Sequence, residues 1–234
     1  MPMTDKTIIF TDGASRGNPG PGGWGAIIVE GTQVKEIGGG ETRTTNNRME
    51  LDAAINALKE VPAGAKVKLY TDSQYLINGI TKWINAWMKN EWKTKEKKDV
   101  LNKEYWQNLH KACEGKEIEW LRVKGHSNIG GNERCDEIAT HVADGNKPIL
   151  FKGDMINYDV DVAEPTEEQM SESSDRERKN SKAYSYLSLV DGGVQRHSDW
   201  ADCKARVDGQ KGAKFRKSIS KEDEEDIVRG WGIK

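Results

Sequence analysis

The stretch TIIFTDGASRGNPGPGGWGAIIVE, residues 7–30, decides the fold. Its first five residues, TIIFT, are β-branched or aromatic and predict a strand, and residues 22–29 predict a second strand. The segment between them is so dense in Gly and Pro that it indicates a turn. Two strands joined by so short a turn pair antiparallel, so we expect a hairpin here.

Strands and helices alternate after this hairpin. The spacing of apolar residues and of Gly and Pro predicts strands over residues 33–38, 66–71 and 117–123, and helices over 45–58, 81–88, 102–114 and 133–142. This order is typical of a mixed α/β fold, in which a sheet is flanked by helices.

Composition limits the class of protein. The 36 Lys and Arg residues nearly cancel the 38 Asp and Glu residues, so a signal for nucleic-acid binding must be local. Apolar runs are too short for a membrane span. The start, MPMTDKTIIFTD, has an acidic residue where a signal peptide has positive charge, and only a short apolar run. Three widely spaced cysteines indicate a reducing compartment. We therefore expect a cytoplasmic protein without a membrane partner.

Charge also divides the chain. The net charge is +1 over residues 1–150, −5 over 151–180 and +2 over 181–234. The acidic, Ser-rich middle is typical of a solvated linker, and aromatic residues return after it. We expect three parts: a first domain at 1–147, an acidic flexible linker at 148–181 and a small α+β domain at 182–234.

Four carboxylates lie where acidic residues are not expected. Asp12 and Asp72 each follow a predicted strand, Glu50 lies within an amphipathic helix, and Asp136 follows a glycine-rich loop. Strand ends border the functional crevice of an open α/β sheet. Carboxylates gathered there would repel one another unless cations bind, and oxygen ligands favour Mg²⁺ or Mn²⁺.

The segments around these residues resemble ribonuclease H type I. The resemblance rests on TDGASRGNPGPGGWGAI, TRTTNNRMEL, YTDSQYLINGI, the spacing W-x₃-W-x₄-W from Trp83, and VKGHSNIGGNERCDE, which follow the order of the family over roughly residues 5–145. It implies a five-stranded mixed sheet flanked by helices. It also implies endonucleolytic cleavage of the RNA strand of an RNA/DNA hybrid.

The resemblance extends to the catalytic residues. Asp12, Glu50, Asp72 and Asp136 match the metal-binding carboxylates of the family, and His126 matches its mobile-loop histidine. It implies two Mg²⁺ ions with the substrate, with Mn²⁺ as a substitute, and products with 3′-hydroxyl and 5′-phosphate ends. Each acid alone could be an ordinary turn, cap or solvated residue, and their joint occurrence in the motifs favours catalysis.

Polar residues beside the acidic motifs match positions that contact the hybrid in the family. Asn18, Asn46 and Gln74 carry amides, which donate and accept hydrogen bonds and so suit 2′-hydroxyl groups. A turn role for Asn18 and a cap role for Asn46 are the alternatives. Arg43 and Thr45 match a pocket that holds a phosphate of the DNA strand.

A basic segment interleaved with tryptophans matches the protrusion that grips the DNA strand in the family. Residues 82–98 hold six Lys and two Glu. Trp83, Trp87 and Lys89 are the expected contacts, because lysines and aromatic rings together suit a nucleic-acid backbone. Packing of the tryptophans against each other is the alternative, and we expect both roles.

The C-terminal segment from Trp200 to Lys217 resembles the hybrid-binding domain at the N-terminus of eukaryotic ribonucleases H. The matching contact positions are Tyr186, Trp200, Phe215, Arg216 and Lys217, whose rings would stack on sugars while the basic pair meets phosphate. The preceding hairpin, LSLVDGGVQRH, lacks the basic run of that domain. A small structural cap is therefore the alternative.

These observations predict a monomeric Mg²⁺-dependent ribonuclease H with a tethered hybrid-binding module. Two other functions are less consistent with the sequence. A catalytically silent hybrid-binding protein is disfavoured because all four acids are present. Another nuclease of the same fold is disfavoured by the NPGPGG, TTNNRMEL and VKGH segments.

Overall fold

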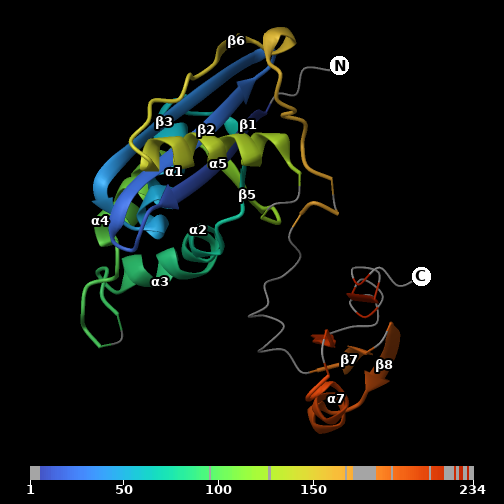
Figure 1. Cartoon of the computed structure of the whole chain (residues 1–234). Helices are drawn as coiled ribbons and strands as arrows, with labels where there is room; N and C mark the ends of the chain where they lie inside the picture. Colours follow the sequence, from blue (N-terminus) through green and yellow to red (C-terminus); the bar gives the residue numbers. More distant parts are fainter. Residues whose placement is uncertain are drawn as a thin grey trace. The chain divides into compact units, whose positions relative to one another are not determined.

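A computed structural model describes residues 6–94, 96–125, 128–166, 168–170, 183–190, 192–210, 212–218, 224, 227–228 and 231. The chain divides into two units, Met1–Ser171 and Glu172–Lys234. Each unit is described by itself, and Figure 1 shows the elements of both.

The first unit is built on a mixed sheet of six strands in the order β5-β4-β1-β2-β3-β6 (Figure 1). β1 and β2 form the expected antiparallel hairpin, β3 continues it antiparallel, and β4 and β5 add on the other side in parallel. The bounds are β1 (Thr7–Ser15), β2 (Gly20–Glu30), β3 (Gln33–Thr44), β4 (Lys66–Thr71), β5 (Glu117–Arg122) and β6 (Lys152–Asp154). The mixed fold is thus confirmed, and β6 is a strand beyond the five expected.

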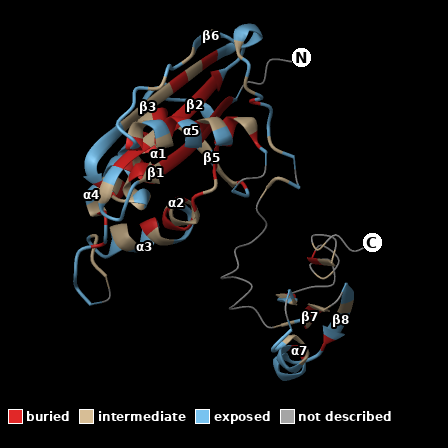
Figure 2. Cartoon of the chain, viewed as in Figure 1, coloured by how far each residue is buried: buried red, intermediate tan, exposed pale blue. Residues whose placement is uncertain are grey.

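Helices cover both faces of the sheet. They are α1 (Asn46–Lys59), α2 (Gln74–Asn78), η1 (Gly79–Trp83), α3 (Ile84–Lys89), α4 (Lys103–Cys113) and α5 (Gly130–Ala143). Alternation along β1 supplies both cores: Ile9 packs with α1, α2 and α4, and Phe10 packs with α5 on the opposite face. Figure 2 shows that buried residues gather in the strands of the sheet and in the helices that cover it. In the part of the chain that the structure describes, no helix has the length and apolar character needed to cross a bilayer.

The segment after α5 stays on the first unit as far as Met170. β6 pairs antiparallel with β3, the short helix η2 (Met155–Asn157) follows, and Val162 is buried in the core on the α5 side. Met170 then forms a bridge with Val123. We call residues 151–166 and 168–170 the strap.

The strap differs from the solvated linker that the sequence predicted from residue 148. Its composition is acidic, but Glu164 pairs with Lys68 of the sheet, and the rings of Phe151 and Tyr158 pack together. The described part of the expected linker therefore belongs to the first unit. Residues 171–181, the rest of that linker, lie outside the described residues, and their role as a tether stays a prediction.

The second unit is a small α+β arrangement. Its sheet has the order β8-β7-β9, with β7 (Ser185–Val190), β8 (Gly193–His197) and β9 (Lys214–Ser218), and the helix α7 (Trp200–Val207) packs against it. The side chain of Asp199 caps this helix by accepting a hydrogen bond from the N–H of Asp202 at 3.0 Å.

Mild proteolysis should cut the chain within residues 171–182 and leave an N-terminal fragment that ends beyond Met170. The strap resists cutting because its backbone is paired with β3 and Val123, whereas the Ser-rich acidic segment has the composition of a protease-sensitive linker. Mass spectrometry of the first products checks the boundary. A first fragment that ends near residue 150 would contradict this placement of the strap.

Candidate active site

Three carboxylates from three elements meet at one end of the sheet. Asp12 lies on β1, Glu50 on α1, and Asp72 directly after β4, and one ligand oxygen from each lies within 4.8 Å of the others. Asp12 and Glu50 are only 7% and 4% exposed. Charges of one sign are costly when buried together, so this group can hold a metal ion.

The local sequence brings α1 close to β1. Gly13 allows the approach, since a Cβ at this position would lie 2.4 Å from the backbone nitrogen of Glu50. Thr45 starts the helix, because its hydroxyl accepts a hydrogen bond from the N–H of Arg48. Met49 and Leu51 are completely buried on either side of Glu50. These contacts fix the rotation of α1 and thus the direction of the Glu50 side chain.

Burial and mutual repulsion raise the pKa values of the carboxylates. Burial raises the pKa of Asp12 to about 8, the charge of Asp72 adds to the effect, and the Gly13 N–H, at 2.7 Å from Asp12 Oδ1, opposes it. Burial also raises the pKa of Glu50 well above its ordinary value, with the charge of Asp12 as the next cause. Without cations, burial and repulsion therefore favour the protonated form of Asp12 at neutral pH.

The donor set fits a hard divalent cation. Glu50 Oε1 accepts a hydrogen bond from Asn46 Nδ2 at 3.3 Å, whereas the buried Glu50 Oε2 has no hydrogen-bond partner among the described residues. An unpartnered buried carboxylate oxygen beside two further carboxylates suits a metal ligand. A ligand set made only of oxygens favours Mg²⁺ or Mn²⁺ over zinc.

Asp136 of α5 faces the same pocket from another side. Its charge is among the causes that raise the pKa values of Asp12 and Glu50. The pocket has a volume of about 510 Å³ and is lined by Asp12, Gly13, Asn46, Asn47, Glu50, Asp72, Ser73, Gln74, Tyr75, Asn132, Glu133 and Asp136. The structure therefore brings the four carboxylates singled out in the sequence to one pocket.

Two of the amides predicted to contact substrate, Asn46 and Gln74, line this pocket at the first residues of α1 and α2. Sequence reasoning missed Asn47 and Asn132. Asn47 follows Asn46 in the TTNN segment, and this adjacency was a signal for a second pocket amide. Asn132 lies buried in α5, and its nearness to Asp136 in sequence was the signal that it lines the pocket.

The other predicted residues of this region lie outside the described pocket lining. Asn18 is exposed in the turn between β1 and β2, and Arg43 is exposed near the end of β3. Thr45 is the N-cap of α1. His126 lies outside the described residues, so its role stays a prediction.

Comparison with known proteins identifies the family. The RNase H family model matches residues 4–144, more than half of the chain. The chain belongs to the RNase H family. It is 53% identical over 137 residues to a ribonuclease H of Caulobacter sp. (strain K31), covering 58% of this chain and 89% of that protein. It is 56% identical over 131 residues to a ribonuclease H of Bradyrhizobium sp. (strain ORS 278), covering 56% and 85%.

A solved structure of an RNase H supports the same assignment. LC9-RNase H1, described as a type 1 RNase H with the type 2 active-site motif, superposes with a TM-score of 0.58 at 27% identity. The superposition covers 67% of this chain and 81% of that one. The chain is a ribonuclease H enzyme, and the match to the family lies within the first unit.

Tryptophans of the basic segment pack inside the RNase H unit. The rings of Trp83 and Trp87 lie 5.6 Å apart, and Trp87 lies 5.4 Å from Trp106, which is completely buried. Trp83 and Trp87 remain partly exposed, and Lys89 is exposed at the end of α3. The packing role is therefore present, and the exposed parts leave room for the predicted contact with DNA.

In the second unit, three of the five residues predicted from the eukaryotic hybrid-binding domain share one ring cluster. Trp200 lies 5.8 Å from Tyr186 and 5.0 Å from Phe215, between ring centroids. Lys217 pairs with Tyr186 across the sheet, so it lies on the same face. Arg216 pairs with Leu187 and so belongs to the opposite face.

Proposed function

We propose that this RNase H hydrolyses the RNA strand of RNA/DNA hybrids at the pocket formed by Asp12, Glu50, Asp72 and Asp136, with two divalent ions, and leaves 3′-hydroxyl and 5′-phosphate ends. The observation that carries this proposal is the convergence of buried carboxylates around an unpartnered oxygen of Glu50. The match to this chain covers most of the length of two relatives that are ribonucleases H, which supports the reaction class.

The residues of the chain have distinct tasks. When bound, Mg²⁺ ions supply the charge that activates a water molecule and neutralises the leaving oxygen. Asp12, Glu50 and Asp72 would hold the ions in the pocket, and Asp136 would contribute a carboxylate from α5. Asn46 orients Glu50 through the hydrogen bond to Oε1. His126, from the family resemblance, would assist proton movement or product departure.

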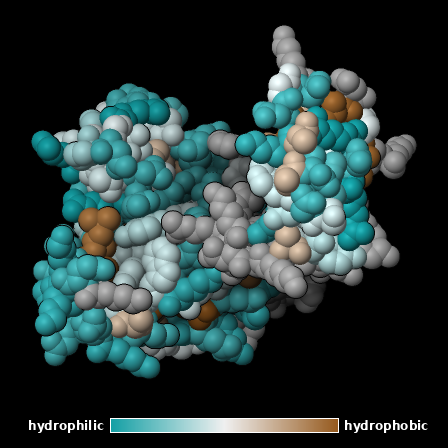
Figure 3. Space-filling view, turned by 90° about the horizontal axis from the view of Figure 1, so that it is seen from below, coloured by the Kyte–Doolittle hydropathy of each residue, from teal (hydrophilic) through white to brown (hydrophobic). Residues whose placement is uncertain are grey.

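Recognition of RNA falls to the amides beside the carboxylates. Asn46, Asn47 and Gln74 line the pocket at the starts of two helices, where a 2′-hydroxyl could both donate and accept hydrogen bonds. Lys89 and the exposed edges of Trp83 and Trp87 would meet the DNA strand. Hydrophilic residues dominate the described part of the face drawn in Figure 3.

Cleavage of labelled substrates tests the proposal. With Mg²⁺, the chain should cut the RNA strand of a hybrid and leave RNA duplex and DNA duplex of the same sequence intact. The 5′ ends of the products should accept ligation without prior phosphorylation. Binding of hybrid without cleavage would favour the silent hybrid-binding protein, and cleavage of DNA duplex would favour another nuclease of the same fold.

The second unit is proposed to bind the same hybrid through its ring cluster. Trp200 and Phe215 are 40% and 54% exposed although their rings touch, and large aromatic side chains are seldom left so open without a partner. Lys217 on the same face could meet a phosphate while the rings stack on sugars.

The double variant Trp200→Ala and Phe215→Ala should raise KM on long hybrids about three- to tenfold with little change in kcat, because a tethered second site adds effective concentration only. On hybrids too short to reach both sites, KM should not change. Tyr184→Ala is the matched control, since Tyr184 is 46% exposed in the same unit but its ring faces Arg196. If the double variant and the original chain have equal KM values on long hybrid at low salt, the second unit is a structural cap and does not bind hybrid.

A further inference from the structure

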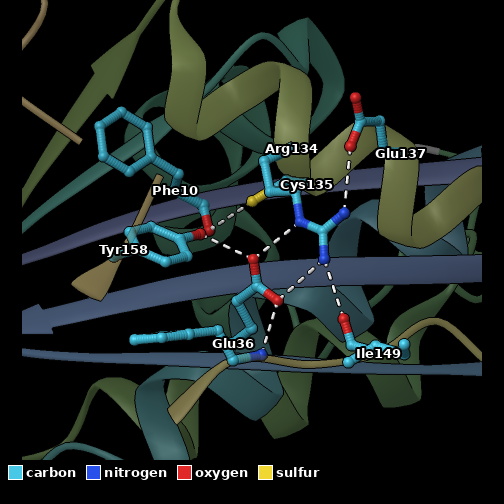
Figure 4. Close-up of polar contacts among 8 residues, drawn as sticks. Phe10, Glu36, Arg134, Cys135, Glu137, Ile149 and Tyr158 are labelled. Atoms are coloured by element: carbon cyan, nitrogen blue, oxygen red, sulfur yellow. Dashed lines mark hydrogen bonds and ion pairs between the residues drawn. The ribbon is translucent and has the colours of Figure 1, made fainter. Parts of the chain in front are cut away.

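A buried ion pair links the sheet to α5 outside the pocket (Figure 4). The side chain of Glu36 on β3 is 0% exposed, and Arg134 of α5 donates to both of its oxygens, at 2.8 and 3.1 Å. Burial alone would raise the pKa of Glu36, but hydrogen bonds from Arg134, Tyr158 and the Phe151 N–H hold it below its ordinary value. Glu36 is therefore a charged residue, which we call the anchor, and the position of its carboxylate depends on the hydrogen-bond donors around it.

The strap supplies two of the four hydrogen bonds to this anchor. The Tyr158 hydroxyl donates to Glu36 Oε1 at 2.7 Å, and the Phe151 N–H donates to Oε2 at 2.8 Å. Arg134 also donates to the carbonyl oxygen of Ile149, just before the strap, at 2.9 Å. A buried carboxylate that lost donors would shift or take up a proton, and Arg134 would lose its fixed partner.

The strap also holds the start of α5. The Lys124 N–H, in the loop before this helix, donates to the carbonyl oxygen of Gln169 at 3.0 Å. The N-cap residue Ile129 gives the helix no side-chain hydrogen bond. Instead the backbone of Asp161 packs so closely that a Cβ at Gly130 would lie 2.5 Å from its carbonyl oxygen. The first turn of α5 is thus held by the strap.

The position of α5 decides where Asp136 lies. Asp136 is two residues after Arg134. Of the four carboxylates predicted to bind metal, it lies outside the close group that the other three form among the described residues. β1, which carries Asp12, contacts the same helix, because the Cys135 thiol donates to the carbonyl oxygen of Phe10 on β1 at 3.3 Å. A small shift of α5 would therefore change the spacing of Asp136 from the other ligands.

On the basis of the proposed function, we infer that the strap is a positioning segment of the active site: acting through Glu36 and Arg134, it sets the place of Asp136 and so the affinity for divalent ions. The strap lies beyond residue 144, where the match to the family model ends. Support of the metal site by groups that do not touch the ion is a common source of metal affinity.

Tyr158→Phe in the full chain tests this inference, because it removes one hydrogen bond to Glu36 and keeps the ring that packs on Phe151. Tyr105→Phe is the matched control. Its hydroxyl donates to Glu41 at 3.1 Å, but Tyr105 lies on α4, on the other face of the sheet. The Mg²⁺ dissociation constant is measured by calorimetry without substrate, and kcat and KM are measured against Mg²⁺ concentration.

Tyr158→Phe should raise the Mg²⁺ dissociation constant about three- to tenfold, since loss of supporting hydrogen bonds weakens metal sites. The Mg²⁺ concentration for half-maximal kcat should rise equally, while KM for hybrid stays within about twofold. Tyr105→Phe should change none of these values. A lower thermal midpoint with an unchanged Mg²⁺ dissociation constant would overturn the inference. The titration needs no hydrolysis, so a wild-type chain that bound Mg²⁺ but did not cleave hybrid would contradict the proposed function alone.

Discussion

Asp12→Asn should abolish hybrid cleavage and, without divalent ions, stabilise the fold. The substitution removes a ligand charge from the close group of three carboxylates but almost no volume. The amide oxygen can still accept the hydrogen bond from the Gly13 N–H. We expect kcat to fall below about 1% of its original value while hybrid binding persists, because the carboxylates bind the metal and other residues bind the hybrid.

The gain in stability follows from the raised pKa of Asp12. The folded chain keeps this proton up to about pH 8, whereas the unfolded chain releases it near pH 4. Between these values the unfolded state binds fewer protons, so stability falls as pH rises. Asparagine does not titrate. The variant should therefore gain up to about 5 kcal/mol over the original chain near pH 8, and little near pH 4.

Thermal unfolding in a chelator at pH 5, 7 and 8, with cleavage and hybrid binding measured in Mg²⁺, checks both effects. Asp144→Asn is the control, because Arg16 lowers the pKa of this exposed carboxylate and the stability difference should have the opposite sign. That variant should retain full activity. An Asp12→Asn protein with more than a few per cent activity would contradict the assignment of the four carboxylates.

The convergence of the four carboxylates on one pocket could be predicted from the sequence because its determinants are local. Asp12 and Asp72 directly follow β-rich runs, and Gly13 sits beside Asp12 where α1 must approach. The hairpin at residues 7–30 was likewise predicted correctly, since Gly and Pro mark its turn. His126, the monomeric state and the cytoplasmic location stay predictions.

The strap could not be predicted because its contacts are distant in sequence and its pattern is irregular. Phe151, Tyr158 and Val162 are scattered through an acidic stretch without helical or strand spacing. Their partners lie far back in the chain, as for Tyr158 and Glu36. Glu36 itself reads as an ordinary polar residue of a short strand. Only the fold shows that its side chain is completely buried.

Arg134→Met should strongly destabilise the fold although Arg134 lies outside the pocket. It leaves the buried Glu36 with only the donors of the strap, Tyr158 and the Phe151 N–H. Breaking a buried pair by removing one partner costs about 3–5 kcal/mol, because an uncompensated charge stays inside. Lys103→Met is the matched control, since it breaks the exposed pair with Asp99 and should cost less than about 1 kcal/mol. Denaturant unfolding of both variants measures the difference.

The pH dependence distinguishes a lost charge partner from simple loss of packing. In the original chain the pKa of Glu36 lies below its ordinary value. The ionised side chain therefore stabilises the fold at any pH above the ordinary pKa of a glutamate, and this stabilisation is lost only as the pH falls through the lowered pKa. In Arg134→Met, burial should raise the pKa of Glu36, so protonation relieves the penalty as pH falls. The deficit should therefore be largest near pH 7 and narrow toward pH 4.

Adding Glu36→Gln to Arg134→Met should restore part of the loss at pH 7. The amide carries no charge to bury, and its oxygen can still accept a hydrogen bond from Tyr158 or the Phe151 N–H. Replacing both members of a buried pair is far less costly than removing one. If the two substitutions instead destabilise additively, so that the double variant is less stable than Arg134→Met alone, burial of the Glu36 charge is not the cause of the lost stability.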